Sequence, residues 1–215
     1  MKKIVLIGDS IRLGYEAYVR AAFRDVAEVY APKENCRFAH YVFRYLHEWK
    51  QLGEWPSDVD VVHWNAGLWD LISFFDDEPQ TAPASYAEII PRIHKRLHVL
   101  FPKAKIIFAT STSVDDEAYR TSSYKRSNAV IKKYNDIAVA ALASTDSLID
   151  DLFPLTLTLP DSARSDLTHF NNDEGCRYLG SWVTACIARA LDIDPATLGA
   201  VDAKAAAISA DILGY

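Results

Sequence analysis

Short apolar runs alternate along the chain with longer segments in which apolar residues recur every three or four positions. The runs predict buried parallel strands, and the segments with a period near 3.6 predict amphipathic helices. We expect strands at residues 3–7, 26–30, 60–64, 105–110 and 147–149. We expect the main helices at residues 12–24, 38–52, 86–101, 127–143 and 173–191.

Strands that alternate with helices in this way predict an α/β protein, a parallel sheet with helices on both faces. For five strands we expect the flavodoxin-like order, in which the carboxyl ends of the first and third strands lie side by side. Ser10 and Asn65 follow these two strands, so we expect them to be neighbours at a crevice. The acidic segment 73–83 is interpreted as a surface excursion, and residues 151–172 as a long connection.

The 215 residues are enough for one sizeable core, and no linker divides them. We expect one domain over residues 1–194. The Ala-rich tail, residues 195–215, is predicted to add a helix to the same domain or to pack on it.

Composition narrows the possible partners and the compartment. The net charge of −6 argues against a nucleic-acid partner, and the lack of a long apolar run argues against a membrane partner. The apolar run after the first Lys residues is too short for a signal peptide, and the spacing of three cysteines fits no disulfide framework or zinc site. We therefore expect a cytoplasmic protein that needs no cofactor. The sequence leaves open whether it forms a homo-oligomer.

The stretch Gly8-Asp9-Ser10 lies where the first strand turns into a helix. Free backbone N–H groups and the positive end of the helix dipole can stabilise an oxyanion there, so a hydroxyl at this place suits a nucleophile. Ser and Asp are also the preferred helix caps. The stretch alone leaves both interpretations open.

The second chemical motif is Asp166-Leu167-Thr168-His169. The carboxylate can orient the imidazole, and the other ring nitrogen can then act as a general base for a hydroxyl. A capping or surface pair is the alternative interpretation. A G-x-S-x-G elbow, the signature of α/β-hydrolases, is absent.

With its first block at Gly8-Asp9-Ser10 and its last at Asp166-x-x-His169, the sequence resembles the GDSL-type, or SGNH, esterases and lipases. The resemblance implies a three-layer α/β/α sandwich, the SGNH hydrolase fold. It also implies that Ser10 is the nucleophile, His169 the general base and acid, and Asp166 its orienting partner. The substrate would be a small-molecule carboxylic ester with a short acyl group such as acetyl, on a carbohydrate in some members, and the acyl-enzyme reaction would need no metal.

The middle blocks depart from the family pattern. Where the family has a Gly whose N–H faces the oxyanion, this chain has Cys36, which we expect to supply that N–H; the alternative is a small buried residue. In the third block Trp69 stands at the position of the family's Asn. We therefore expect the oxyanion donors to be the N–H groups of Ser10 and Cys36 and the side-chain amide of Asn65.

Two functions of other classes stay open. One is a non-catalytic flavodoxin-like module in which Ser10 caps a helix and an anion binds there. The other is a metal-dependent hydrolase that uses four possible ligands, namely Asp9, His63, Asp70 and His169.

Two further histidines, His94 and His98, stand four residues apart on a predicted helix. This spacing can hold a metal ion, but Lys95 and Arg96 beside them favour a solvated helix face. We expect no metal there. His63 and Trp64, in the third strand, are interpreted as core or cleft-lining residues.

Overall fold

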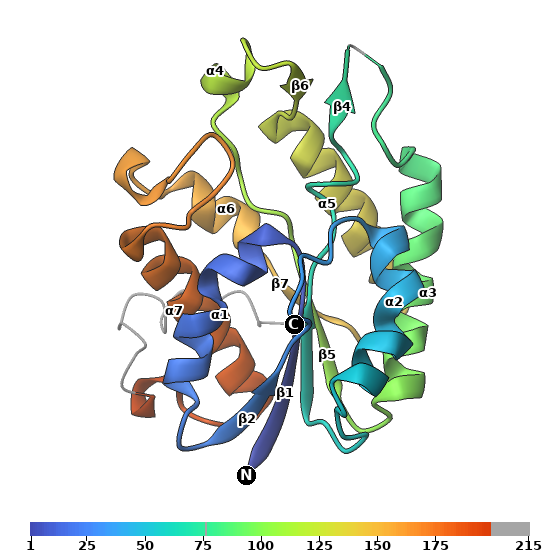
Figure 1. Ribbon diagram of the computed structural model, residues 1–215, viewed down its shortest axis with the longest axis vertical. Helices are drawn as coiled ribbons and strands as arrows, with labels where there is room; N and C mark the ends of the chain where they lie inside the picture. The colour runs from blue at the N-terminus through green and yellow to red at the C-terminus, as the bar shows by residue number, and fades with distance from the viewer. Residues whose placement is uncertain (76, 199–215) are drawn as a thin grey trace.

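The computed structural model describes residues 1–75 and 77–198 and contains a five-stranded parallel sheet at its centre (Figure 1). Its strands are β1 (Lys2–Ile7), β2 (Ala27–Tyr30), β3 (Val61–Trp64), β5 (Lys105–Ala109) and β7 (Leu148–Asp150). They lie in the order β2-β1-β3-β5-β7, and every neighbouring pair is parallel. The predicted flavodoxin-like order is therefore confirmed.

Helices cover both faces of the sheet and complete a three-layer α/β/α sandwich, as Figure 1 shows. One layer contains α1 (Ser10–Ala22) packed on α7 (Asp173–Ala190). The other contains α2 (Ala39–Leu52), α3 (Pro83–Leu100) and α5 (Asn128–Leu142). In the described ranges, no helix combines the length and the apolar character needed to cross a bilayer.

The core lies between the sheet and these two layers. Residues 4–7 of β1 and all of β3 are buried, because strands covered on both faces must be apolar along their whole length. His63 is the polar exception in β3, and its Nε2 lies 2.9 Å from Oδ2 of the buried Asp150. The interpretation of His63 and Trp64 as core residues is confirmed.

Several short elements were not predicted. The strands β4 (Ser73–Phe74) and β6 (Tyr124–Lys125) pair antiparallel in a small ribbon above the carboxyl ends of the sheet (Figure 1). The segment 73–83, predicted as a surface excursion, thus begins with a strand and ends at the first residue of α3. The remaining elements are α4 (Asp116–Tyr119), α6 (Leu152–Leu157) and two turns of 3₁₀ helix, Asp161–Ala163 and Pro195–Thr197.

The predicted C-terminal tail is described only at its beginning. Pro195–Thr197 lies against α7, and Leu198 is buried in the core, so the packed domain continues at least to residue 198. The helix predicted for the rest of the tail lies outside the described residues.

Candidate active site

The turn between β1 and α1 places Ser10 as the first residue of a helix without using its hydroxyl as the cap. The cap is Asp9, whose Oδ1 accepts the N–H of Ile11 at 3.0 Å. Burial raises the pKa of the Asp9 carboxyl. Because Asp9 caps the helix, the Ser10 hydroxyl is available for another partner.

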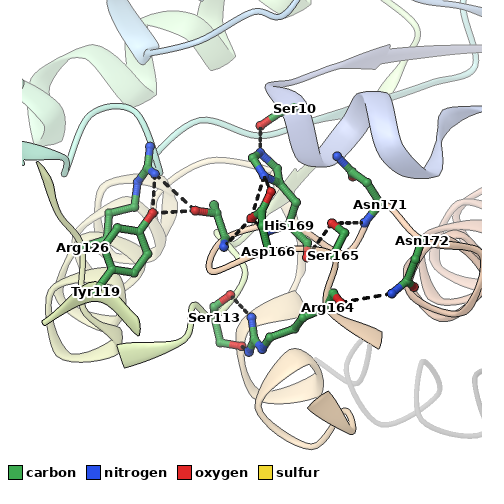
Figure 2. Close-up of polar contacts among 11 residues, drawn as sticks. Ser10, Ser113, Tyr119, Arg126, Arg164, Ser165, Asp166, His169, Asn171 and Asn172 are labelled. Atoms are coloured by element: carbon green, nitrogen blue, oxygen red, sulfur yellow. Dashed lines mark hydrogen bonds and ion pairs between the residues drawn. The ribbon is translucent and has the colours of Figure 1, made fainter. Parts of the chain in front are cut away.

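That partner is His169, which is linked in turn to Asp166 (Figure 2). The Ser10 Oγ lies 2.8 Å from His169 Nε2, and His169 Nδ1 lies 2.8 Å from Oδ2 of Asp166. The structure therefore brings the three residues of the sequence hypothesis into one hydrogen-bonded chain. The arrangement can remove a proton from Ser10 and stabilise the imidazolium that results.

A tight turn before α7 holds Asp166 in this position. Its Oδ1 accepts the backbone N–H of Thr168 at 2.7 Å and that of His169 at 2.8 Å. Partial burial acts to raise the pKa of Asp166, but the hydrogen bonds from Thr168 and His169 outweigh it and lower the pKa. The carboxylate therefore stays ionised beside the imidazole.

Asn65 lies next to the Ser10 turn because β1 and β3 are neighbours. The Asn65 N–H donates to the carbonyl of Ile7 at 3.0 Å, and its side chain is almost fully buried. A Cβ atom on Gly8 would lie 1.9 Å from the side-chain oxygen of Asn65, so only glycine allows this approach. The structure thus places an amide beside the first turn of α1, as the strand order predicted.

The expectation for Cys36 is corrected. Its N–H donates to the carbonyl of Gly8 at 3.1 Å, so it is directed at the main chain and the prediction that it faces an oxyanion is wrong. The guanidinium of Arg12 donates to the carbonyls of Glu34 at 2.6 Å and Gly8 at 3.4 Å, which ties the same loop to the turn. The buried Cys36 side chain fits the alternative of a small core residue.

Arg12 itself was not predicted as a site residue. Its side chain is fully buried and forms an ion pair with Glu16. The signal was present in the sequence, because Arg12 precedes Tyr15 by three residues and Val19 by seven, on the buried stripe of α1. A charged residue on an apolar stripe indicates a specific partner.

The Ser10–His169 pair opens into a cleft of about 400 Å³. The ribbon formed by β4 and β6 gives one wall, and the lining is mainly apolar and aromatic, including Leu68, Trp69, Ile72, Phe74 and Tyr124. Arg126 also lines the cleft and was not predicted.

The guanidinium of Arg126 contacts two parts of the cleft, and Figure 2 shows its contact with Tyr119. Its Nε donates to the Leu68 carbonyl at 2.8 Å, and its Nη1 donates to the Tyr119 hydroxyl at 2.8 Å. The Tyr119 hydroxyl lies 2.5 Å from Oγ1 of Thr168, the residue before His169. Arg126 thus connects the loop after β3 with the turn that carries His169.

The four residues considered as a metal site have separate partners. Asp70 accepts the N–H of Ala39 at the start of α2, and burial raises its pKa to about 7. His63 pairs with Asp150, and Asp9 caps α1. Within the described ranges, the one group with the proximity of metal ligands does not include any of these four residues.

The expectation for His94 is also corrected. His94 is 4% exposed rather than on a solvated face, and Asp146 of the loop before β7 contacts both His94 and His98.

Comparison with known proteins agrees with this architecture. No protein-family model matches the sequence, and no curated protein matches it. The structure is similar to that of a lipase/acylhydrolase from Enterococcus faecalis, with a TM-score of 0.68 and 20% identity over 94% of this chain and 100% of that one. The structure is also similar to that of an acetylxylan esterase from Geobacillus stearothermophilus. The TM-score is 0.64 and the sequence identity 15%, over 94% of this chain and 97% of that one.

A GDSL-like lipase from Bacteroides thetaiotaomicron gives a TM-score of 0.64 and 15% identity over 88% of this chain and 89% of that one. In these three comparisons the similarity extends over 88–94% of this chain and 89–100% of the other chain. The chain therefore has the three-layer α/β/α fold of the GDSL-like, or SGNH, lipases and esterases.

Proposed function

We propose that this protein is a serine esterase that cleaves carboxylic esters through an acyl-enzyme at Ser10. The observation that carries the proposal is the hydrogen-bonded chain Ser10–His169–Asp166 at the mouth of the cleft. A hydroxyl, an imidazole and an ionised carboxylate in this order are the groups that nucleophilic acyl transfer requires.

In the first half of the reaction, Ser10 Oγ attacks the ester carbonyl while His169 Nε2 takes its proton. The imidazolium is stabilised by Asp166, which accepts the Nδ1–H. The imidazolium then gives its proton to the leaving alcohol, and the acyl group stays on Ser10. In the second half, water attacks the acyl-enzyme carbonyl while His169 takes its proton. The bond to Ser10 Oγ then breaks, the imidazolium returns the proton to Ser10 Oγ, and the acid is released.

Two donors are available for the oxyanion in this proposal. The N–H of Ser10 is the first amide of α1, where helix geometry leaves the donor without a partner in its own helix. The amide of Asn65 is the second donor in this proposal. Its side-chain oxygen lies against Gly8, and its NH₂ group lies beside the Asp9 carboxyl of the same turn. With Cys36 bonded to Gly8, these two groups replace the three donors expected from the sequence.

The cleft favours small acyl groups. Its volume of about 400 Å³ lies near the lower end of the range for small-molecule sites, and the aromatic wall from β4 and β6 closes one side. We therefore propose short-chain esters, with acetyl esters of carbohydrates as the first class to test. Similarity to proteins described as acetyl xylan esterases supports that choice.

The alternative of a non-catalytic anion-binding module is less consistent with the site. An anion at the start of α1 would meet the buried carboxyl of Asp9, which already accepts the Ile11 N–H. The Ser10 hydroxyl is also paired with His169, an arrangement that a simple helix cap does not need.

Hydrolysis of p-nitrophenyl acetate, with acetylated xylo-oligosaccharides as the second substrate, tests the proposal. We expect Ser10→Ala and His169→Ala to lower kcat by roughly 10³-fold or more, while Ser144→Ala, at an exposed position, serves as the matched control. Folding of Ser10→Ala should be normal because Asp9, not Ser10, caps the helix. Wild-type activity that persists in Ser10→Ala would contradict the proposal.

A further inference from the structure

A group of three potential metal ligands lies far from Ser10, at the opposite edge of the sheet. His94 and His98 occupy the last two turns of α3, and Asp146 precedes the first residue of β7. Because α3 leads into β5, both segments lie at the amino ends of parallel strands. Ser10 instead follows the carboxyl end of β1, so the group cannot be part of the proposed esterase site.

The three side chains converge on one point. The Nε2 atoms of His94 and His98 each lie 2.9 Å from Oδ1 of Asp146, and the three ligand atoms lie within 4.8 Å of one another. The two histidines are four residues apart, so both rings project from the same face of the helix. Asp146 reaches them from a loop 48 residues beyond His98.

The chemistry of the three groups suits a borderline divalent cation. His94 and His98 each offer one imidazole nitrogen, and Asp146 offers one carboxylate oxygen. Within the described part of the chain, Asp146 has no ion pair with Lys or Arg.

Two of the three separations between ligand atoms are close to those of a tetrahedral site. Bonds of about 2.0–2.1 Å at tetrahedral angles separate ligand atoms by roughly 3.3 Å. The 2.9 Å contacts therefore need to open by only about 0.4 Å, and Asp146 can move because its side chain is 73% exposed. The His94 side chain is only 5% exposed, so the surrounding residues restrict its movement.

We propose that His94, His98 and Asp146 form a binding site for Zn²⁺ or a similar first-row divalent cation. Two imidazoles and one carboxylate are the donor set of zinc rather than of Mg²⁺ or Ca²⁺, which take oxygen ligands. The ion joins the end of α3 to the loop between α5 and β7 and leaves a fourth position to water.

The site is expected to exchange its metal readily. Among the described residues, Nδ1 of His94 has no hydrogen-bond partner, so the orienting acceptor that usually strengthens a metal-bound histidine is missing. Chelators should therefore remove the ion without unfolding the protein, and the effect of the ion should be on stability rather than on ester hydrolysis.

Metal binding to the EDTA-treated and dialysed protein tests the proposal directly. We expect one Co²⁺ or Zn²⁺ per chain, with a visible Co²⁺ absorption typical of low coordination number, measured by spectroscopic titration and calorimetry. At a Zn²⁺ concentration about 100-fold above Kd, Tm should rise by roughly 5–10 °C.

Variants separate this site from other histidines. His98→Gln and Asp146→Asn change partly exposed side chains, so they should fold, and we expect each to weaken the affinity by at least about 100-fold. His47→Gln, at an exposed histidine of α2, is the matched control and should bind as wild type does. His169→Gln should also retain the ion, which excludes binding at the Ser10 site.

Absence of stoichiometric binding to the wild-type protein would overturn the proposal. Equal affinity of the wild type, His98→Gln and Asp146→Asn would also overturn it.

Discussion

Replacing Asp166 by Asn tests whether the carboxylate sets the protonation state of His169. In the structure, Oδ1 of Asp166 accepts the N–H groups of Thr168 and His169, and Oδ2 lies 2.8 Å from Nδ1 of the imidazole. In Asp166→Asn the two backbone donors should retain the amide oxygen, so the NH₂ group takes the place of Oδ2. An imidazole that accepts this NH₂ at Nδ1 carries its proton on Nε2, where it cannot receive the proton of Ser10. The amide oxygen, 3.0 Å from Nδ1, competes as an acceptor and limits the loss.

The magnitude follows from this change of tautomer. A carboxylate-to-amide change at a buried partner of this kind lowers kcat by about 10⁴-fold. The Asp166 side chain is 50% exposed, so water competes for the ring nitrogen. We therefore expect a loss of about 10³-fold, equivalent to about 4 kcal/mol of transition-state stabilisation.

The assay is kcat and kcat/KM for a p-nitrophenyl ester, with urea unfolding of the same preparations. Both turn hydrogen bonds persist in Asp166→Asn, so its unfolding free energy should stay close to that of the wild type. Asp161→Asn, at an exposed position in the same loop, is the matched control. A folded Asp166→Asn variant with kcat within about tenfold of the wild type would refute the role of the carboxylate.

Three other variants test the surroundings of Ser10. Asn65→Ala should lower kcat by about 10²–10³-fold with little change in KM, as loss of an oxyanion donor does, and unchanged kcat would exclude the amide. Gly8→Ala should destabilise the fold by about 1–3 kcal/mol in urea unfolding, because the new Cβ meets Asn65 Oδ1 at 1.9 Å and Arg12 Cβ at 2.8 Å; an unchanged midpoint would contradict the close packing. The pKa of Asp70 is raised from 3.8 to about 7, so the native state keeps a proton that the unfolded chain releases, and wild-type stability falls as pH rises between these values. The stability of Asp70→Asn relative to the wild type should therefore increase by up to about 4 kcal/mol from about pH 4 to about pH 8, and a constant difference would contradict this ionisation.

The architecture could be predicted because each central strand is a local apolar run and each main helix has its own apolar stripe. The strands and helices lie within a few residues of their predicted bounds, and the strand order follows from five parallel strands with helical crossovers. The ribbon of β4 and β6 could not be predicted. Each strand has two residues, and the pairing of Phe74 with Tyr124 depends on contacts 50 positions apart.

The three residues of the proposed triad could be predicted from the sequence for a similar reason. Asp166 and His169 are three residues apart in one turn, and Ser10 follows the first strand directly. The direction of the Cys36 N–H depends on the conformation of its loop, which Arg12 of α1 contacts through the Glu34 carbonyl. A comparison of sequence motifs could not predict that direction. Side-chain chemistry at fixed spacing was predictable, and the orientation of a single backbone donor was not.

The environment of His94 shows the same limit. Its helix carries Lys95 and Arg96, which indicated a solvated face, yet the ring is buried against Asp146 from a distant loop. Helical periodicity describes one helix at a time, whereas the burial of His94 depends on how α3 packs on α5.

Covalent labelling of Ser10 tests the central proposal most directly. The protein is treated with a fluorophosphonate, and the adduct is measured by intact mass and located by peptide mapping. We expect one adduct per chain on Ser10, none in Ser10→Ala, and much slower labelling in Asp166→Asn, because the reagent needs the same activated hydroxyl. A wild-type protein that hydrolyses p-nitrophenyl acetate but is labelled at another residue, or not at all, would contradict the assignment of Ser10 as the nucleophile.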